Sequence, residues 1–134
     1  MGTVRIFLVE DSSIIRENLA DALRENAPVE IVGSADDEAT AIAWLQHERA
    51  ACDLVIIDIF LKGGSGLGVL RAMADLASAP TRIVLSNHAT PEVRAKCLEL
   101  GATQVFDKSN ELEEMLAWLK RFARSDLGAA ASHS

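Results

Sequence analysis

The feature that most constrains this chain is a short, wholly aliphatic run that ends in a carboxylate. The run is Leu54-Val55-Ile56-Ile57 and Asp58 follows it directly; an earlier run, Val4 to Val9, ends at Glu10-Asp11. Strands that are apolar on both faces belong to parallel sheets covered by helices, and such sheets bind ligands at the carboxyl ends of their strands. We therefore expect three carboxylates to converge at one edge of a buried parallel sheet.

Strand patterns alternate with helix patterns along the whole chain. We expect strands at 4–9, 29–32, 54–57, 82–85 and 104–106, each followed by apolar residues at helical spacing. The helices have recognisable start signals, namely Ser12 or Ser13, Asp36 or Asp37, the turn 63–66, Thr90-Pro91, and Ser109 or Asn110, and Gly101 ends the fourth. Five βα units predict an α/β fold, a doubly wound (βα)5 flavodoxin-like sandwich with the parallel strand order 2-1-3-4-5.

Length and composition indicate one domain whose partners are proteins. We expect a domain over residues 1–123 and a flexible tail over 124–134, frayed from Asp126 onward. Lys and Arg total 13 against 20 Asp and Glu, so the net charge is −7, which argues against direct binding of nucleic acid. Cys52 and Cys97 lie in apolar segments and are expected to be reduced core residues. The amino terminus carries no long apolar segment, so we expect a cytoplasmic protein without a membrane span.

The predicted strand order gathers five polar residues at one edge. This strand order has its topological switch point between the first and third strands, and these two strands end at Glu10-Asp11 and at Asp58. Ser86 and Lys108 end the fourth and fifth strands at the same edge. Clustered carboxylates repel unless a cation neutralises them, and oxygen ligands without His or Cys suit Mg²⁺. A lysine and a hydroxyl can bind the remaining phosphoryl oxygens, so this group of residues suits phosphoryl transfer with Asp58 as the nucleophile.

These residues resemble the signature of response regulator receiver domains, the CheY-like family of two-component signalling. The resemblance covers residues 4–123 and includes Val-Glu-Asp-Ser at 9–12, Gly-Gly-Ser-Gly-Leu at 63–67 and Leu-Ser-Asn-His-Ala at 85–89. It implies that Asp58 accepts a phosphoryl group from a phosphohistidine on a sensor histidine kinase or phosphotransfer protein.

The resemblance also implies a role for each of the other site residues. Asp11 and Asp58 would ligate Mg²⁺ through their side chains, Phe60 through its backbone carbonyl, and Glu10 through a coordinated water. Ser86 would donate a hydrogen bond to a phosphoryl oxygen, and Lys108 would form an ion pair with the phosphoryl group.

Two positions depart from the family pattern. Val105 stands where the family has an aromatic ring that follows the movement of the strand-four hydroxyl, so the usual switch cannot operate through this side chain. Ser109 follows Lys108 where the family has a proline with a cis peptide bond. Because a cis bond before another residue costs about 3 kcal/mol, we expect a trans bond here.

The first functional hypothesis is a single-domain signalling switch. It would act through phosphorylation-dependent contacts of the fourth helix, fifth strand and fifth helix with an unidentified protein target, with homodimerisation possible. It would not be an enzyme beyond phosphorylating itself from small donors and losing the phosphoryl group. The residues after Lys120 are too few for an effector domain.

A phosphatase of the haloacid dehalogenase type is disfavoured because its Asp-x-Asp motif should end the first strand, whereas Asp58 ends the third. A receiver-like binding module that works without phosphorylation is the remaining alternative, motivated by Val105.

Overall fold

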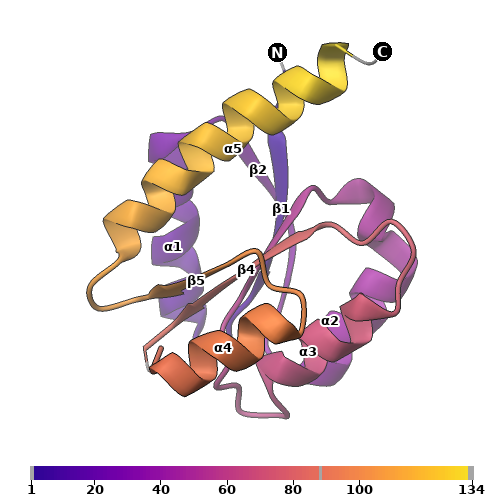
Figure 1. Ribbon diagram of the computed structural model, residues 1–134, viewed down its shortest axis with the longest axis vertical. Helices are drawn as coiled ribbons and strands as arrows, with labels where there is room; N and C mark the ends of the chain where they lie inside the picture. Colours follow the sequence, from indigo (N-terminus) through magenta and orange to yellow (C-terminus); the bar gives the residue numbers. More distant parts are fainter. Residues whose placement is uncertain (1, 88, 133–134) are drawn as a thin grey trace.

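The computed structural model describes residues 2–87 and 89–132, with side chains through Arg124, and shows a five-stranded parallel sheet between two layers of helices (Figure 1). The strand order is β2-β1-β3-β4-β5, as predicted. The strands are β1 (Val4–Val9), β2 (Val29–Ala35), β3 (Leu54–Ile57), β4 (Thr81–Ser86) and β5 (Gln104–Asp107). The helices are α1 (Ser13–Asn26), α2 (Glu38–Glu48), the short 3-10 helix η1 (Arg49–Ala51), α3 (Gly66–Ala74), α4 (Pro91–Glu99) and α5 (Leu112–Ser132).

The sheet separates two apolar cores. On one face, β-strand side chains such as Val55 and Ile57 pack with α2, α3 and α4; Phe7 stacks on Trp44 with 4.1 Å between ring centroids. On the other face, Ile56 and its neighbours pack with α1 and α5. The alternate residues of β3 therefore enter opposite cores, and all four are buried, as a parallel strand covered on both faces requires.

Most strand predictions are confirmed, and β2 is the main correction. It runs to Ala35, three residues beyond the predicted end at Val32. The pairing with β1 shifts between Ile6 and Phe7, and Gly33 then lies opposite Phe7. Residues 33–35 lie beyond the apolar run that predicted the strand, but the backbone of β1 continues to supply pairing partners there.

The predicted helix starts are largely confirmed. Ser12, Asp37 and Thr90 each accept a hydrogen bond from a backbone amide in the first turn of α1, α2 and α4. Pro91 is the first residue of α4, and Gly101 after that helix has a φ of 107°. Buried Cys52 and Cys97 are free thiols, as expected.

Both ends of α5 differ from prediction. The helix begins at Leu112 and not at Ser109 or Asn110, because the amide of Ser109 donates 2.7 Å to the Asp107 carboxylate and closes a turn first. The helix continues to Ser132, so residues 126–132 are helical where a frayed end was expected, and 133–134 lie outside the described residues. Alanines at 129–131 have the highest intrinsic helix propensity.

Two further backbone findings concern the whole described chain. Residues 2–87 and 89–132 contain no cis peptide bond, so the trans Lys108–Ser109 bond is confirmed. None of the helices in these ranges is long and apolar enough to cross a membrane.

Gly66 gives a test of how closely α3 approaches the end of β3. A Cβ at Gly66 would lie 2.2 Å from the Asp58 carbonyl oxygen and 2.8 Å from Ile57 Cγ2. Because that oxygen belongs to the backbone of the residue that directly follows the central strand, we expect Gly66→Ala to lower the free energy of urea unfolding by roughly 3 kcal/mol. Gly68→Ala is the control, because a Cβ there meets only the flexible end of Glu38, and its stability should change by less than about 1 kcal/mol. Equal stability of the two variants would contradict the prediction.

Candidate functional site

Two buried carboxylates, Glu10 and Asp58, end the neighbouring strands β1 and β3. They follow Val9 and Ile57, which are direct partners in the parallel pairing. The Asp58 amide donates to the Val9 carbonyl at 2.9 Å, and the Glu10 amide donates to the Ala35 carbonyl at 3.0 Å. Backbone pairing thus continues past both strands and fixes where the two carboxylates leave the sheet.

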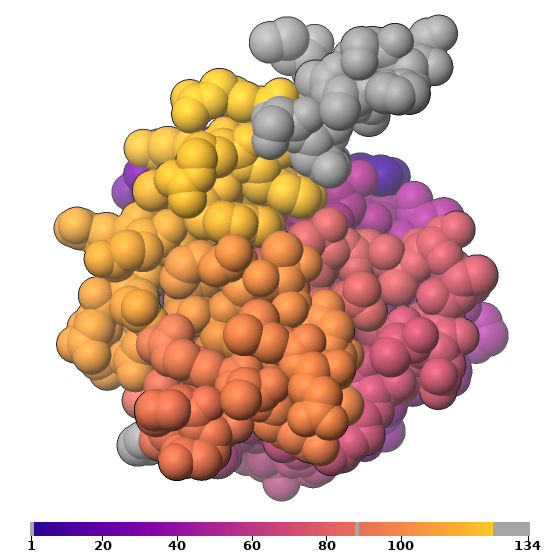
Figure 2. Space-filling view, in the orientation of Figure 1, coloured from indigo at the N-terminus to yellow at the C-terminus, as the bar shows by residue number. Residues whose placement is uncertain are grey.

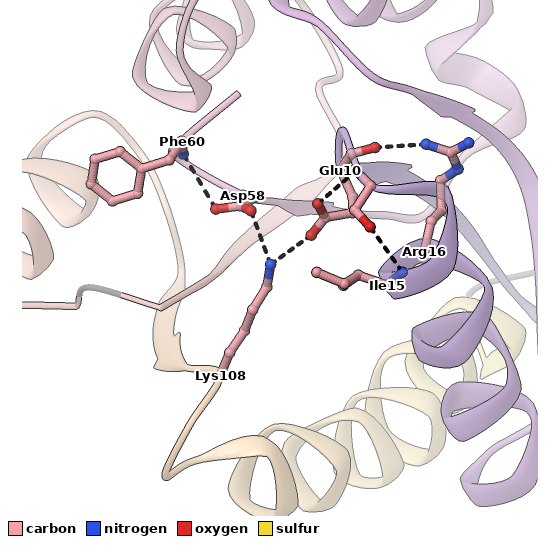
Figure 3. A network of polar contacts seen from close by, with 7 residues as sticks. Glu10, Ile15, Arg16, Asp58, Phe60 and Lys108 are labelled. Atoms are coloured by element: carbon pink, nitrogen blue, oxygen red, sulfur yellow. Dashed lines mark hydrogen bonds and ion pairs between the residues drawn. The ribbon is translucent and has the colours of Figure 1, made fainter. Parts of the chain in front are cut away.

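Lys108 lies between these carboxylates (Figure 3). Its Nζ is 2.5 Å from Glu10 Oε1 and 2.9 Å from Asp58 Oδ2, and its side chain is only 13% exposed. Burial alone would lower the pKa of the Lys108 ammonium, but hydrogen bonds and attraction from Glu10 and Asp58 outweigh this, so the pKa is raised. A fully charged ammonium therefore neutralises part of the acidic pair.

The remaining carboxylate oxygens are also held. Asp58 Oδ1 accepts from the Phe60 amide at 3.3 Å, and Glu10 Oε2 accepts from the Ser12 amide at 3.1 Å. Arg16 Nη1 donates to the Glu10 carbonyl oxygen at 2.7 Å (Figure 3). These contacts orient both side chains before any ligand arrives, which is the condition for electrostatic preorganisation.

Ser86 is the last residue of β4 and is fully buried. Its carbonyl accepts from the Lys108 amide at 2.9 Å, which places β4 and Lys108 at the same edge. The Ser86 hydroxyl has no hydrogen-bond partner among the described residues. Buried polar atoms without a partner are uncommon and call for an explanation, and a ligand at this edge would provide one.

Asp11 and Phe60 lie at the same strand ends, but their side chains are not part of the contacts among Glu10, Asp58 and Lys108. The Asp11 carboxylate accepts no hydrogen bond from any residue that the structure describes, and the Phe60 side chain is 54% exposed. Within residues 2–87 and 89–132, no three His, Cys, Asp or Glu side chains are arranged to hold a metal ion. The structure therefore brings Glu10, Asp58 and Lys108 into contact and does not gather Asp11 with them into a three-residue cluster.

The sequence did not identify the charged side chains that hydrogen-bond to backbone carbonyls near this edge. Arg94 of α4 donates to the Ala89 carbonyl at 3.0 Å and the Val105 carbonyl at 2.9 Å, and it forms an ion pair with Glu111. Hydrogen bonds from Arg94 and from the Asp107 amide hold the pKa of the Glu111 carboxyl below its usual value. Arg16 and Arg94 bind backbone carbonyls, and no local sequence pattern announces such contacts.

The profile of a family described as "Response regulator receiver domain" matches residues 6–120. A protein-glutamate methylesterase/protein-glutamine glutaminase of Myxococcus xanthus is 32% identical over 113 residues, covering 84% of this chain and 32% of that protein. A counterpart from Anaeromyxobacter dehalogenans is 34% identical over 110 residues, covering 78% and 29%. The chain therefore spans about a third of the length of these curated relatives.

Solved structures share the fold over nearly the whole chain. The signal receiver domain of the response regulator NarL from Mycobacterium tuberculosis aligns with a TM-score of 0.80 and 24% identity, covering 93% of this chain and 99% of that one. The phosphorylated cyanobacterial phytochrome response regulator RcpA aligns with a TM-score of 0.75 and 25% identity, covering 93% and 96%.

The unpartnered Ser86 hydroxyl leads to a prediction about stability. We expect Ser86→Ala to unfold in urea with a free energy within about 0.5 kcal/mol of wild type, or higher, because no described hydrogen bond is lost. The control is Ser65→Ala, whose hydroxyl accepts from the Leu67 amide at the start of α3 and donates to Ile59, and it should cost about 1 kcal/mol. A larger loss for Ser86→Ala than for Ser65→Ala would contradict this account.

The raised pKa of Lys108 leads to a prediction about alkaline pH. A raised folded-state pKa means that Lys108 stabilises the fold fully below its unfolded value of about 10.4, and that this stabilisation is lost as pH rises through the folded value. Wild type should therefore be more stable than Lys108→Met at neutral pH. The difference between their free energies of urea unfolding should become smaller near pH 11. Burial raises the pKa of Cys52 to about 11, which affects both proteins alike. If this difference did not change with pH, protonation of Lys108 would not be coupled to the stability of the fold.

Proposed function

The chain belongs to the response regulator receiver family, and from this premise we propose that Asp58 accepts a phosphoryl group from the phosphohistidine of a sensor histidine kinase or phosphotransfer protein. One observation carries the proposal: the Asp58 carboxylate is buried at the end of the central strand with the Lys108 ammonium 2.9 Å away. The receiver occupies residues 1–123 in this proposal, and 124–134 follow it.

The transfer is a displacement at phosphorus. A carboxylate oxygen of Asp58 forms the new P–O bond, the P–N bond to the donor imidazole breaks, and the imidazole keeps the electron pair. Lys108 offsets the negative charge that the phosphoryl oxygens bring to the carboxylate edge. The same chemistry with a small phosphodonor gives self-phosphorylation, and attack by water on the acyl phosphate gives autodephosphorylation.

Ser86 takes the second contact to the phosphoryl group. Its buried hydroxyl, which lacks a partner among the described residues, supports a role as hydrogen-bond donor to a phosphoryl oxygen. The Ser86 carbonyl accepts a hydrogen bond from the Lys108 amide, so the two residues whose side chains would bind the phosphoryl group are also joined through their backbones.

Mg²⁺ is the cofactor that the donor atoms fit. Carboxylate and carbonyl oxygens suit a hard cation, and Mg²⁺ characteristically binds one or two carboxylates together with waters and a substrate phosphate. Asp11, Asp58 and the Phe60 carbonyl would hold the ion directly, and Glu10 would act through a coordinated water. When bound, Mg²⁺ supplies charge neutralisation at the transferring phosphoryl group. Glu10 has a second task, because it also orients Lys108.

The output of the phosphorylated receiver is a protein contact. α4 and the start of α5 are both exposed on the face of the molecule seen in Figure 2, and Arg94 of α4 forms an ion pair with Glu111, which directly precedes α5. We assign the downstream contact, or a homodimer contact, to this face together with β5. The curated relatives are named for esterase and glutaminase activity over a length about three times that of the matched region, and we assign residues 1–123 the phosphoacceptor role alone.

A receiver-like module that binds proteins without phosphorylation is the second candidate. Val105 favours it, because this residue is 7% exposed and provides no aromatic ring to report on movement of Ser86. The two candidates differ in whether Asp58 ever carries a phosphoryl group.

Phosphorylation of Asp58 is the decisive test. After incubation with Mg²⁺ and acetyl phosphate, intact-protein mass spectrometry should show one added phosphoryl group on the wild-type chain and none on Asp58→Ala. Asp75→Ala is the matched control, because Asp75 is an exposed carboxylate at the end of α3 and its loss should leave the adduct unchanged. A folded wild-type protein that neither gains the group nor releases phosphate would favour the second candidate.

A further inference from the structure

Glu38, the first residue of α2, holds the loop between β3 and α3 against the beginning of this helix. The side-chain Oε1 of Glu38 accepts from the Ser65 amide at 2.8 Å, and the Glu38 amide donates to the Gly63 carbonyl at 2.9 Å. The preceding residue, Asp37, forms an isolated parallel bridge with Gly63. Glu38 therefore binds the loop at two points, once through its backbone and once through its carboxylate.

Two glycines make room for this carboxylate. A Cβ at Gly68 would lie 2.3 Å from Glu38 Cδ and Oε2, and a Cβ at Gly64, whose φ is +82°, would lie 2.5 Å from Glu38 Cβ. Gly68 is in α3, where glycine costs about 1 kcal/mol relative to alanine and needs another reason to be present. The space it leaves for Glu38 is such a reason.

The contacts continue from Glu38 to the reacting carboxylate. Ser65 pairs with Phe60 in an isolated antiparallel bridge, and the Ser65 hydroxyl donates to the Ile59 carbonyl at 3.3 Å. The Phe60 amide donates to Asp58 Oδ1. A continuous series of contacts therefore joins Glu38, Ser65, Phe60 and Asp58.

We propose that Glu38 is a positioning residue for the Mg²⁺ and phosphoryl site. It does not touch the reacting atoms. By holding Ser65, it fixes the loop that carries Phe60, whose carbonyl would help to hold the cation and whose amide orients Asp58. The inference rests on the proposed function, and it adds α2 to the elements that determine how well the site binds Mg²⁺. Loss of groups that orient metal ligands characteristically weakens metal binding about 10- to 100-fold.

The test is Mg²⁺ binding to the unphosphorylated protein, followed through backbone amide NMR signals of residues 58–65. Glu38→Ala should weaken Mg²⁺ binding about tenfold. Glu38→Gln keeps an acceptor oxygen for the Ser65 amide, so it should retain most of the affinity. Glu48→Ala, which removes an exposed glutamate from the far end of the same helix, should bind like wild type.

A double-mutant cycle separates positioning from helix stability. Gly68→Ala should displace the Glu38 carboxylate and weaken Mg²⁺ binding as Glu38→Ala does, even though alanine favours α3. Glu38→Ala with Gly68→Ala should bind no more weakly than Glu38→Ala alone, because the displaced contact is already absent. Additive losses would overturn the proposal, since they would mean independent effects on two helices.

The outcomes also separate this proposal from the function on which it rests. Wild-type binding of Mg²⁺ together with unchanged affinity in Glu38→Ala would overturn the role of Glu38 and leave the receiver function intact. A wild-type protein that binds no Mg²⁺ and takes no phosphoryl group would overturn both.

Discussion

The ammonium of Lys108 between Glu10 and Asp58 is the interaction on which the site depends. Parallel pairing of Val9 with Ile57 forces the two carboxylates to leave the sheet side by side, where they are buried and repel each other. Lys108 comes from the end of β5, two strands away from β3 in the sheet, and its amide is hydrogen-bonded to Ser86 of β4. Lys108 thus connects the ends of β1 and β3 through its side chain and the end of β4 through its backbone amide. Leaving a buried charge without its partner costs about 3–5 kcal/mol, so the acidic edge and the lysine require each other.

The sequence predicted the strand order and the positions of the strand-end residues because both follow from local patterns. Aliphatic runs ending in Glu10, Asp58 and Ser86 identify parallel strands, and the alternation with helices leaves few topologies. Contacts that depend on distant backbone atoms carried no such pattern. Arg16, which donates to the Glu10 carbonyl, looks like any charged residue on the surface of a helix.

The errors in element boundaries have the same cause. β2 continues through Gly33 because β1 supplies its partners, and α5 starts late because Asp107 first closes a turn with Ser109. In both places a tertiary or turn contact overrides local propensity. Glu38 is a further example, since only the folded chain shows that its carboxylate occupies the space left by Gly68.

With valine at 105, the connection between β4 and β5 is made by backbone and by charged side chains. Ser86 lies opposite Asp107 in the strand pairing, and Arg94 spans the Ala89 carbonyl after β4 and the Val105 carbonyl within β5. Glu111 closes this arrangement by binding both Arg94 and the Asp107 amide. A displacement of the loop after Ser86 would act on α4 and the start of α5 through these contacts, without any aromatic rotation.

The two ends of β3 differ in how fully their charged groups are satisfied within the chain. Asp53, before the strand, accepts three hydrogen bonds from Arg5 alone, through its amide, Nε and Nη2. Burial would raise the pKa of Asp53, but these bonds outweigh it and lower the pKa, so the charge is satisfied by a single partner. Asp58, after the strand, shares the Lys108 ammonium with Glu10. It lies at the same edge as the Ser86 hydroxyl, which has no partner among the described residues. One end is complete within the chain, whereas the other keeps hydrogen-bonding capacity and charge that a phosphoryl group and its cation would use.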